Sequence, residues 1–115
     1  MKITDLLSEK AINLHGKANS KEEAIIQLVD LMVENENIND KEAYKQAVLK
    51  REEEGTTGIG EGIAIPHGKT DAVEKPGLAA MIIPDGVDFK SLDGSPAKLL
   101  FLIAAPNTKD NVHLD

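Results

Sequence analysis

Residues 78–105 read LAAMIIPDGVDFKSLDGSPAKLLFLIAA and hold the two long apolar runs of the chain. The first run ends at Pro84-Asp85-Gly86, and the turn signal Leu92-Asp93-Gly94-Ser95 precedes the second. Continuous apolar runs of this length are typical of strands that are buried on both faces. Because the connection at Asp93-Gly94 is too tight for a parallel crossover, we predict a mixed sheet rather than a purely parallel one.

Two amphipathic helices are predicted before this sheet. Ser20-Lys21-Glu22-Glu23 is a capping box, and the helix that it opens extends to about Glu36. The spacing i, i+3, i+4, i+7 places its apolar residues on one buried face, namely Ile25, Leu28, Val29 and Met32. A second helix begins near Asn39-Asp40-Lys41-Glu42 and ends at Gly55. Its apolar stripe consists of Tyr44, Ala47 and Val48.

The predicted fold class is α/β, a mixed β-sheet flanked by helices in layers, with residues 1–115 as a single domain. Helical signals lie before Gly55 and strand signals after it, including the short apolar strand Ile63-Ala64-Ile65. Between them, the glycines of residues 58–62 predict a loop that tolerates positive φ angles. These glycines precede a strand instead of following one, which argues against a nucleotide-binding loop.

The composition excludes several classes of function. The 115 residues carry 13 Lys and Arg against 20 Asp and Glu, a net charge of −7, and no Cys. This charge argues against binding nucleic acid or an anionic membrane surface, and it favours basic protein partners. The absence of Cys excludes disulfide and thiolate chemistry. Residues 1–7 do not resemble a secretory signal, and the apolar run at residues 99–105 is too short to span a bilayer, so we expect a cytoplasmic domain.

Arg51 ends the apolar stripe of the second helix, seven residues after Tyr44 and three after Val48. An aliphatic residue would suit this position better. The guanidinium either snorkels past the core or pairs with the acidic residues 52–54, or it binds an anion. Residues 52–54 themselves are predicted to form a solvated acidic face.

His67 follows the short apolar strand and lies between Pro66 and Gly68. Because Pro66 restricts the backbone, the imidazole is expected to project from a rigid sheet edge. An ordinary imidazole is mostly neutral at pH 7, so one of its ring nitrogens could attack phosphorus. The alternative is a structural turn histidine that is satisfied by backbone hydrogen bonds.

The other two histidines, His15 and His113, do not complete a metal motif with His67. No pair has the short spacing of metal ligands, and the chain lacks Cys and a His-Glu-x-x-His sequence, so no metal site is expected. A Gly-x-Ser-x-Gly nucleophile motif is also missing, which argues against a serine hydrolase.

Residues 58–69, GIGEGIAIPHGK, resemble the phosphorylation-site signature of enzyme IIA domains of the fructose and mannitol type, from the bacterial sugar phosphotransferase system. Leu49-Lys50-Arg51-Glu52 resembles the arginine-bearing helix end of that family, and Val112-His113-Leu114 resembles its second active-site histidine. The resemblance covers essentially the whole chain. It is closest to the fructose-specific branch, through residues 68–73 and 92–106.

The resemblance implies a phosphocarrier that takes a phosphoryl group from the phosphohistidine of HPr onto His67 and passes it to a cysteine of enzyme IIB, on a separate or a fused chain. Arg51 would stabilise the phosphoryl oxygens, and His113 would donate a further hydrogen bond. Transfer between histidines has no diphosphate leaving group to neutralise, so no metal, nucleotide or other cofactor is expected. The family's domain continues past His113, so the chain is interpreted as lacking a C-terminal helical part.

Two alternatives remain open at this stage. The first is a regulatory module of the nitrogen-related IIA branch or of a transcription regulator, in which phosphorylation of the same histidine controls partner binding and no sugar is moved. The second is a purely structural α/β module. A phosphorylation assay separates the structural module from the others, and the neighbouring genes separate transport from regulation.

Overall fold

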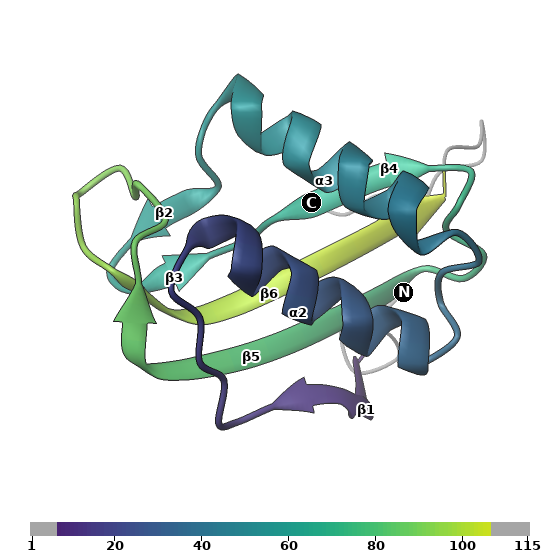
Figure 1. The fold of residues 1–115 in the computed structure, drawn as a ribbon, viewed down its shortest axis with the longest axis horizontal. Coiled ribbons are helices and arrows are strands. Elements are labelled where there is room, and N and C mark those ends of the chain that lie inside the picture. Colours follow the sequence, from purple (N-terminus) through teal and green to yellow (C-terminus); the bar gives the residue numbers. More distant parts are fainter. Residues whose placement is uncertain (1–6, 107–115) are drawn as a thin grey trace.

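One mixed β-sheet and two helices make up the part of the chain that the structure describes, residues 7–106 (Figure 1). The structure is a computed structural model. The strands are β1 (Leu7–Asn13), β2 (Gly58–Gly60), β3 (Ile63–Ala64), β4 (His67–Thr70), β5 (Gly77–Val87) and β6 (Ala97–Pro106), and the helices are α2 (Lys21–Glu34) and α3 (Lys41–Glu54). The predicted fold class, α/β with a mixed sheet and flanking helices, is confirmed.

The two apolar runs form the centre of the sheet as the antiparallel pair β5 and β6. Leu78 lies opposite Ile103, and Met81 lies opposite Leu100. The strand order is β1-β5-β6-β3-β2, and β4 also pairs with β6. Because β1 is parallel to β5 while β3 and β4 are parallel to β6, the sheet is mixed, as predicted.

Both helices begin at the predicted caps. Ser20 is the N-cap of α2, and its side chain accepts a hydrogen bond from the backbone N–H of Glu23. Asp40 caps α3 in the same way, through the N–H of Ala43. The predicted apolar face of α2 is fully buried, in the residues Ile25, Leu28, Val29 and Met32.

Three strand boundaries differ from the prediction. The glycine segment after Gly55 is not a continuous loop, because β2 pairs antiparallel with β3 across the turn Glu61-Gly62, where both φ angles are positive. The strand predicted over residues 63–65 ends at Ala64. Pro84-Asp85-Gly86 does not end β5, because the register between β5 and β6 shifts at this point and pairing resumes at Val87. Long-range pairing overrides the local turn signals at these positions.

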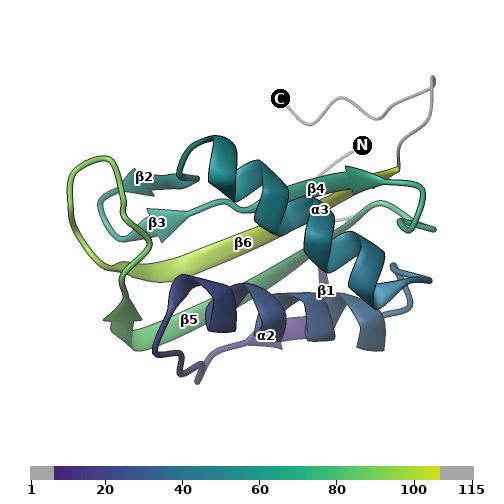
Figure 2. The ribbon, with the colours of Figure 1, turned by 45° about the horizontal axis from the view of Figure 1, so that its top comes forward.

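The sheet is covered by helices on one face only, within the described residues (Figure 2). Alternate residues of β5 and β6 are at most 1% exposed and belong to the same core as the helix residues, namely Ala79, Met81, Ile83, Leu100, Leu102 and Ala104. Their neighbours on the other face vary: Leu78 and Ala80 are 7% and 8% exposed, Ile82 is 38% exposed, and Leu99, Phe101 and Ile103 are half-buried. The prediction that both faces are buried is therefore confirmed only in part, because α2 and α3 cover the same face and the other face is buried at Leu78 and Ala80 but exposed at Ile82.

The strands β3 and β4 follow one another along the same edge of β6. Ala64 pairs with Leu100 and His67 pairs with Ile103, so the register continues across residues 65 and 66. Pro66 interrupts the ladder because it has no N–H to donate. The edge strand β4 therefore begins at His67, and its position along the sheet is determined by β6.

Gly68 allows α3 to pack closely over β4. A Cβ atom at this position would lie 2.7 Å from Cγ2 of Val48, which is closer than real contacts allow, and 3.0 Å from Cε1 of Tyr44, which is tighter than most. The close approach matters for the site because Arg51 follows Val48 by one helical turn. The end of α3 that carries Arg51 therefore packs against β4, the strand that carries His67.

Asp93 fastens the loop between β5 and β6 to the β2–β3 turn. Its carboxylate accepts hydrogen bonds from the backbone N–H of Glu61 at 2.9 Å and from the N–H and hydroxyl of Ser95 at 2.9 and 2.7 Å. The Ser95 hydroxyl and the backbone N–H groups of Glu61 and Ser95 lower the pKa of the Asp93 carboxyl from 3.8 to about 2. The charged form of Asp93 is therefore favoured in the folded state.

This pKa shift predicts a stability change in acid. A carboxyl with a lowered pKa in the folded state stabilises the fold above its unfolded-state pKa, and this stabilisation is lost as the pH falls from about 4 to about 2. We expect Asp93→Asn to be less stable than wild type at pH 6, with a difference that shrinks across this range. Urea unfolding at a series of pH values measures it, with Asp85→Asn as a control that removes the same charge elsewhere. Parallel pH profiles for wild type and Asp93→Asn would contradict the prediction.

Candidate functional site

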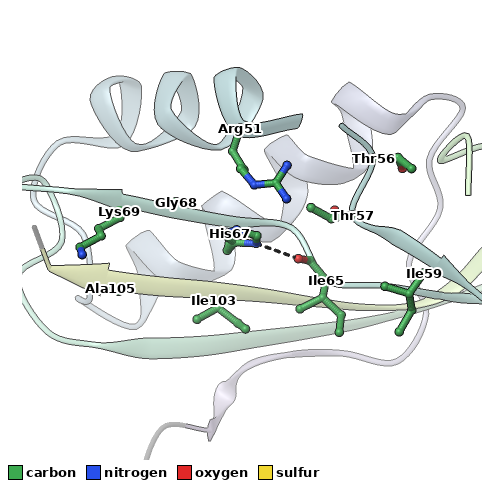
Figure 3. Close-up of a pocket in the computed structure, with 10 residues that line it drawn as sticks. All are labelled: Arg51, Thr56, Thr57, Ile59, Ile65, His67, Gly68, Lys69, Ile103 and Ala105. Carbon is green, nitrogen blue, oxygen red and sulfur yellow. Dashed lines mark hydrogen bonds between the residues drawn. The ribbon is translucent and has the colours of Figure 1, made fainter. Parts of the chain in front are cut away.

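A cavity of about 390 Å³ opens where the end of α3 meets β4 (Figure 3). Arg51 and His67 both line it. Its remaining lining residues are Thr56, Thr57, Ile59, Ile65, Gly68, Lys69, Ile103 and Ala105. A second cavity of about 250 Å³ is also lined by Arg51 and His67, together with Lys50 and Glu54 among others. The structure thus brings together the cation and the imidazole that the sequence singles out.

His67 is half-buried at the start of the edge strand β4. Its Nδ1 atom lies 3.1 Å from the backbone carbonyl oxygen of Ile65. A carbonyl can only accept a hydrogen bond, so this contact favours the tautomer that carries its proton on Nδ1. In that tautomer Nε2 has a free lone pair. The ring is therefore held by the backbone through one nitrogen while the other is available as a nucleophile.

Arg51 extends from the last turn of α3 toward the His67 ring (Figure 3). Its Nη1 atom donates a hydrogen bond to the carbonyl oxygen of Gly55 at 2.9 Å. This hydrogen bond does not use the other N–H donors of the guanidinium. None of the ion pairs found among residues 7–106 includes Arg51. The alternative in which Arg51 pairs with the acidic residues 52–54 was therefore wrong within this part of the chain.

Glu52 is buried, although we predicted from the sequence that it is exposed to solvent. We predicted residues 52–54 to be a solvated acidic face, and Glu53 and Glu54 are indeed exposed. The side chain of Glu52 is only 5% exposed, and it pairs with Lys21 at 2.9 Å. Its carboxylate also accepts hydrogen bonds from Thr57, a residue of the cavity lining. One Glu in a run of three carries no local signal of burial, because its partners come from other parts of the chain.

Of the remaining histidines, His15 is exposed and lines neither of the two cavities that contain His67. His113, predicted as a second phosphoryl-stabilising residue, lies outside the described residues. Between residues 7 and 106, no cluster of three or more His, Cys, Asp and Glu is arranged to hold a metal ion. No helix in this range is both long and apolar enough to cross a membrane.

The cavity combines an imidazole, a guanidinium and an apolar surface. Ile65, Ile103 and Ala105 supply the apolar surface beside the imidazole. An anion such as a phosphoryl group would meet the guanidinium on one side and the ring nitrogen on another, and hydrogen bonds that involve a charged group are about twice as strong as neutral ones. Fold and site together define an α/β domain with a histidine and an arginine at one cavity.

The chain belongs to the family described as "Phosphoenolpyruvate-dependent sugar phosphotransferase system, EIIA 2", whose model matches residues 5–115. It is therefore an EIIA domain, the phosphocarrier class of that system. The chain is 48% identical to the fructose-specific EIIABC component of Bacillus subtilis, over 100% of this chain and 18% of the relative. It is 44% identical to the fructose-specific EIIA component of Haloferax volcanii, over 99% of this chain and 76% of that protein.

Solved structures of this family share the fold. The nitrogen regulatory protein IIA-Ntr of Neisseria meningitidis matches with a TM-score of 0.85 and 29% identity, over 93% of this chain and 73% of that one. The mannitol IIA of Escherichia coli matches with a TM-score of 0.78 and 38% identity, over 90% and 74%. A structure of the E. coli mannitol IIA with phosphorylated IIB matches equally well, at a TM-score of 0.78 and 37% identity over 90% and 72%.

Proposed function

We propose that this domain accepts a phosphoryl group from phospho-HPr on Nε2 of His67 and passes it to enzyme IIB during sugar uptake. In the first step a bond forms between Nε2 and phosphorus while the bond between phosphorus and the donor histidine nitrogen breaks. The electron pair of the broken bond stays on the donor imidazole. In the second step a cysteine thiolate of IIB attacks the same phosphorus, and His67 becomes the leaving group.

One observation carries this proposal: His67 has Nδ1 at a backbone carbonyl while its ring shares a cavity with the Arg51 guanidinium. The backbone contact leaves Nε2 as the reactive nitrogen. Arg51 would stabilise the charge on the equatorial phosphoryl oxygens in the loose transition state. His113 is proposed, from the family resemblance, to donate a further hydrogen bond to the same oxygens.

The proposed sugar and partners rest on the relatives. Fructose-specific components are the relatives with 48% and 44% identity, against 41% for the nitrogen regulatory protein of Bradyrhizobium diazoefficiens. Sugar transport is therefore better supported than the regulatory alternative. The E. coli mannitol domain has been solved with its phosphorylated IIB, and the B. subtilis relative carries EIIA, EIIB and EIIC in one component. A IIB domain is accordingly the acceptor that we propose.

Phosphorylation in a reconstituted system tests this function. The chain is incubated with labelled phosphoenolpyruvate, enzyme I and HPr, and then with a fructose-type IIB. We expect one phosphoryl group per chain, bound to nitrogen and hence labile in acid, that moves to IIB when IIB is added. A protein that takes no label would contradict the phosphocarrier function. A labelled protein that cannot pass its phosphoryl group to any sugar-specific IIB would favour the regulatory alternative.

A further inference from the structure

Glu52 places a buried carboxylate beside Arg51, at the end of α3. We infer that Glu52 is a positioning residue that sets the placement of Arg51 relative to His67 through the segment of residues 55–57. This inference deepens the proposed function and rests on it. Glu52 would not touch the phosphoryl group itself. It would act by holding the backbone of residues 55–57, to which Arg51 donates a hydrogen bond directly and to which His67 is linked through Ile65.

The contacts of Glu52 converge on one neighbouring residue and one distant cation. Oε1 accepts hydrogen bonds from the backbone N–H of Thr57 at 2.8 Å and from Nζ of Lys21 at 2.9 Å. Oε2 accepts from the Thr57 hydroxyl at 2.7 Å. Both carboxylate oxygens thus accept hydrogen bonds, and Thr57 donates to them through its backbone N–H and its hydroxyl. Such a double contact fixes the chain more tightly than either hydrogen bond alone.

Thr57 passes this constraint to His67. Its carbonyl oxygen accepts a hydrogen bond from the backbone N–H of Ile65 at 3.0 Å. Ile65 in turn presents its own carbonyl oxygen to Nδ1 of His67 at 3.1 Å. A continuous series of hydrogen bonds therefore runs from the Glu52 carboxylate to the ring that would carry the phosphoryl group.

The same segment also holds Arg51. The guanidinium donates to the carbonyl oxygen of Gly55, and the N–H of Gly55 donates to the carbonyl oxygen of Glu52 at 3.2 Å. Residues 55–57 consequently connect the arginine at one end with the histidine at the other. Phosphoryl transfer depends mainly on how such groups are positioned. A small displacement of this segment would therefore lower the rate of phosphoryl transfer.

Lys21 explains how a carboxylate can remain buried at this point. It is part of α2, with 22% of its side chain exposed, and its Nζ also lies 3.4 Å from the Thr56 hydroxyl and 4.8 Å from the centre of the Phe89 ring. A buried ion pair contributes little net stability compared with well-packed apolar residues. The contacts of the Lys21–Glu52 pair with residues 55–57 indicate that the pair positions this segment more than it stabilises the fold.

The substitution Glu52→Gln tests the inference, because Gln keeps the size of the side chain but cannot accept hydrogen bonds at its amide nitrogen. Rates of transfer from phospho-HPr to His67 are measured over a range of donor concentrations, at a temperature where circular dichroism shows every variant to be folded. We expect the rate at saturating donor to fall about tenfold, with the apparent KM changed less than about twofold. A merely structural role would lower the melting temperature and leave the rate of the folded protein unchanged.

Matched variants complete the experiment. Glu42→Gln removes an exposed carboxylate from the same helix and should transfer at the wild-type rate. Thr57→Ser keeps the hydroxyl and should retain the rate, whereas Thr57→Val removes it and should slow transfer even if Glu52→Gln does not fold. A wild-type rate in Thr57→Val, or in folded Glu52→Gln, overturns the inference. A wild-type protein that takes no label overturns the proposed function instead. In that case the nitrogen chemical shifts of the His67 ring in Glu52→Gln decide whether Nδ1 still contacts the Ile65 carbonyl oxygen.

Discussion

Replacing His67 with alanine is expected to abolish phosphorylation of this domain by phospho-HPr. The substitution removes the nitrogen to which phosphorus would bind, and the described residues that line the cavity include no second imidazole. The hydroxyls of Thr56 and Thr57 donate to the Phe89 carbonyl and the Glu52 carboxylate, and Arg51 is always protonated. Loss of a covalent nucleophile typically lowers the rate by a very large factor, so we expect a decrease of at least about 10³-fold. Incorporation of labelled phosphate per chain is the measurement.

The fold should survive this substitution. His67 is half-buried at the edge of the sheet, and its backbone pairing with β6 does not need the imidazole. His15→Ala, which changes an exposed histidine outside the cavity, is the matched control and should be labelled like wild type. Equal labelling of His67→Ala and wild type would show that the phosphoryl group is bound elsewhere.

Replacing Arg51 with alanine is expected to slow the transfer without preventing it. The guanidinium would offer its charged donors to the equatorial oxygens, where negative charge accumulates in the transition state. Removing one such stabilising group costs about 10²-fold in rate in comparable sites. The substitution Arg51→Lys should restore only part of the activity, because an ammonium group cannot form the paired, planar hydrogen bonds of a guanidinium.

Single-turnover labelling of Arg51→Ala measures this effect, and Lys50→Ala is the matched control. Lys50 precedes Arg51 on α3, is exposed, and lines only the second of the two cavities. Its removal takes away one positive charge near the site and tests for a general electrostatic contribution. Equal rates in Arg51→Ala and wild type would remove Arg51 from the mechanism, whatever the stability of the variant.

Helix starts, buried helix faces and the antiparallel pairing at the centre of the sheet could be predicted because they depend on neighbouring residues. Ser20 and Asp40 cap helices through N–H groups three residues away. The connection between β5 and β6, residues 88–96, is too short for a parallel crossover, so β6 returns antiparallel beside β5. The site residues His67 and Arg51 could be selected for the same reason, since each interrupts a local pattern: a cation on an apolar stripe, and an imidazole between Pro66 and Gly68.

The amino-acid sequence alone determined the two helices and the central pair of strands, and it indicated the histidine and the arginine as candidates. It predicted neither β1 nor β4, and it predicted a loop where β2 lies. The tertiary structure decided how they meet, because Gly68 lets α3 settle onto β4 and so carries the Arg51 guanidinium to the His67 ring. It also decided that Glu52 is buried, since the Lys21 that pairs with it is 31 residues away in the chain. Long-range contacts of this kind leave no periodic trace in a sequence, because only the packing of separate elements against one another creates them.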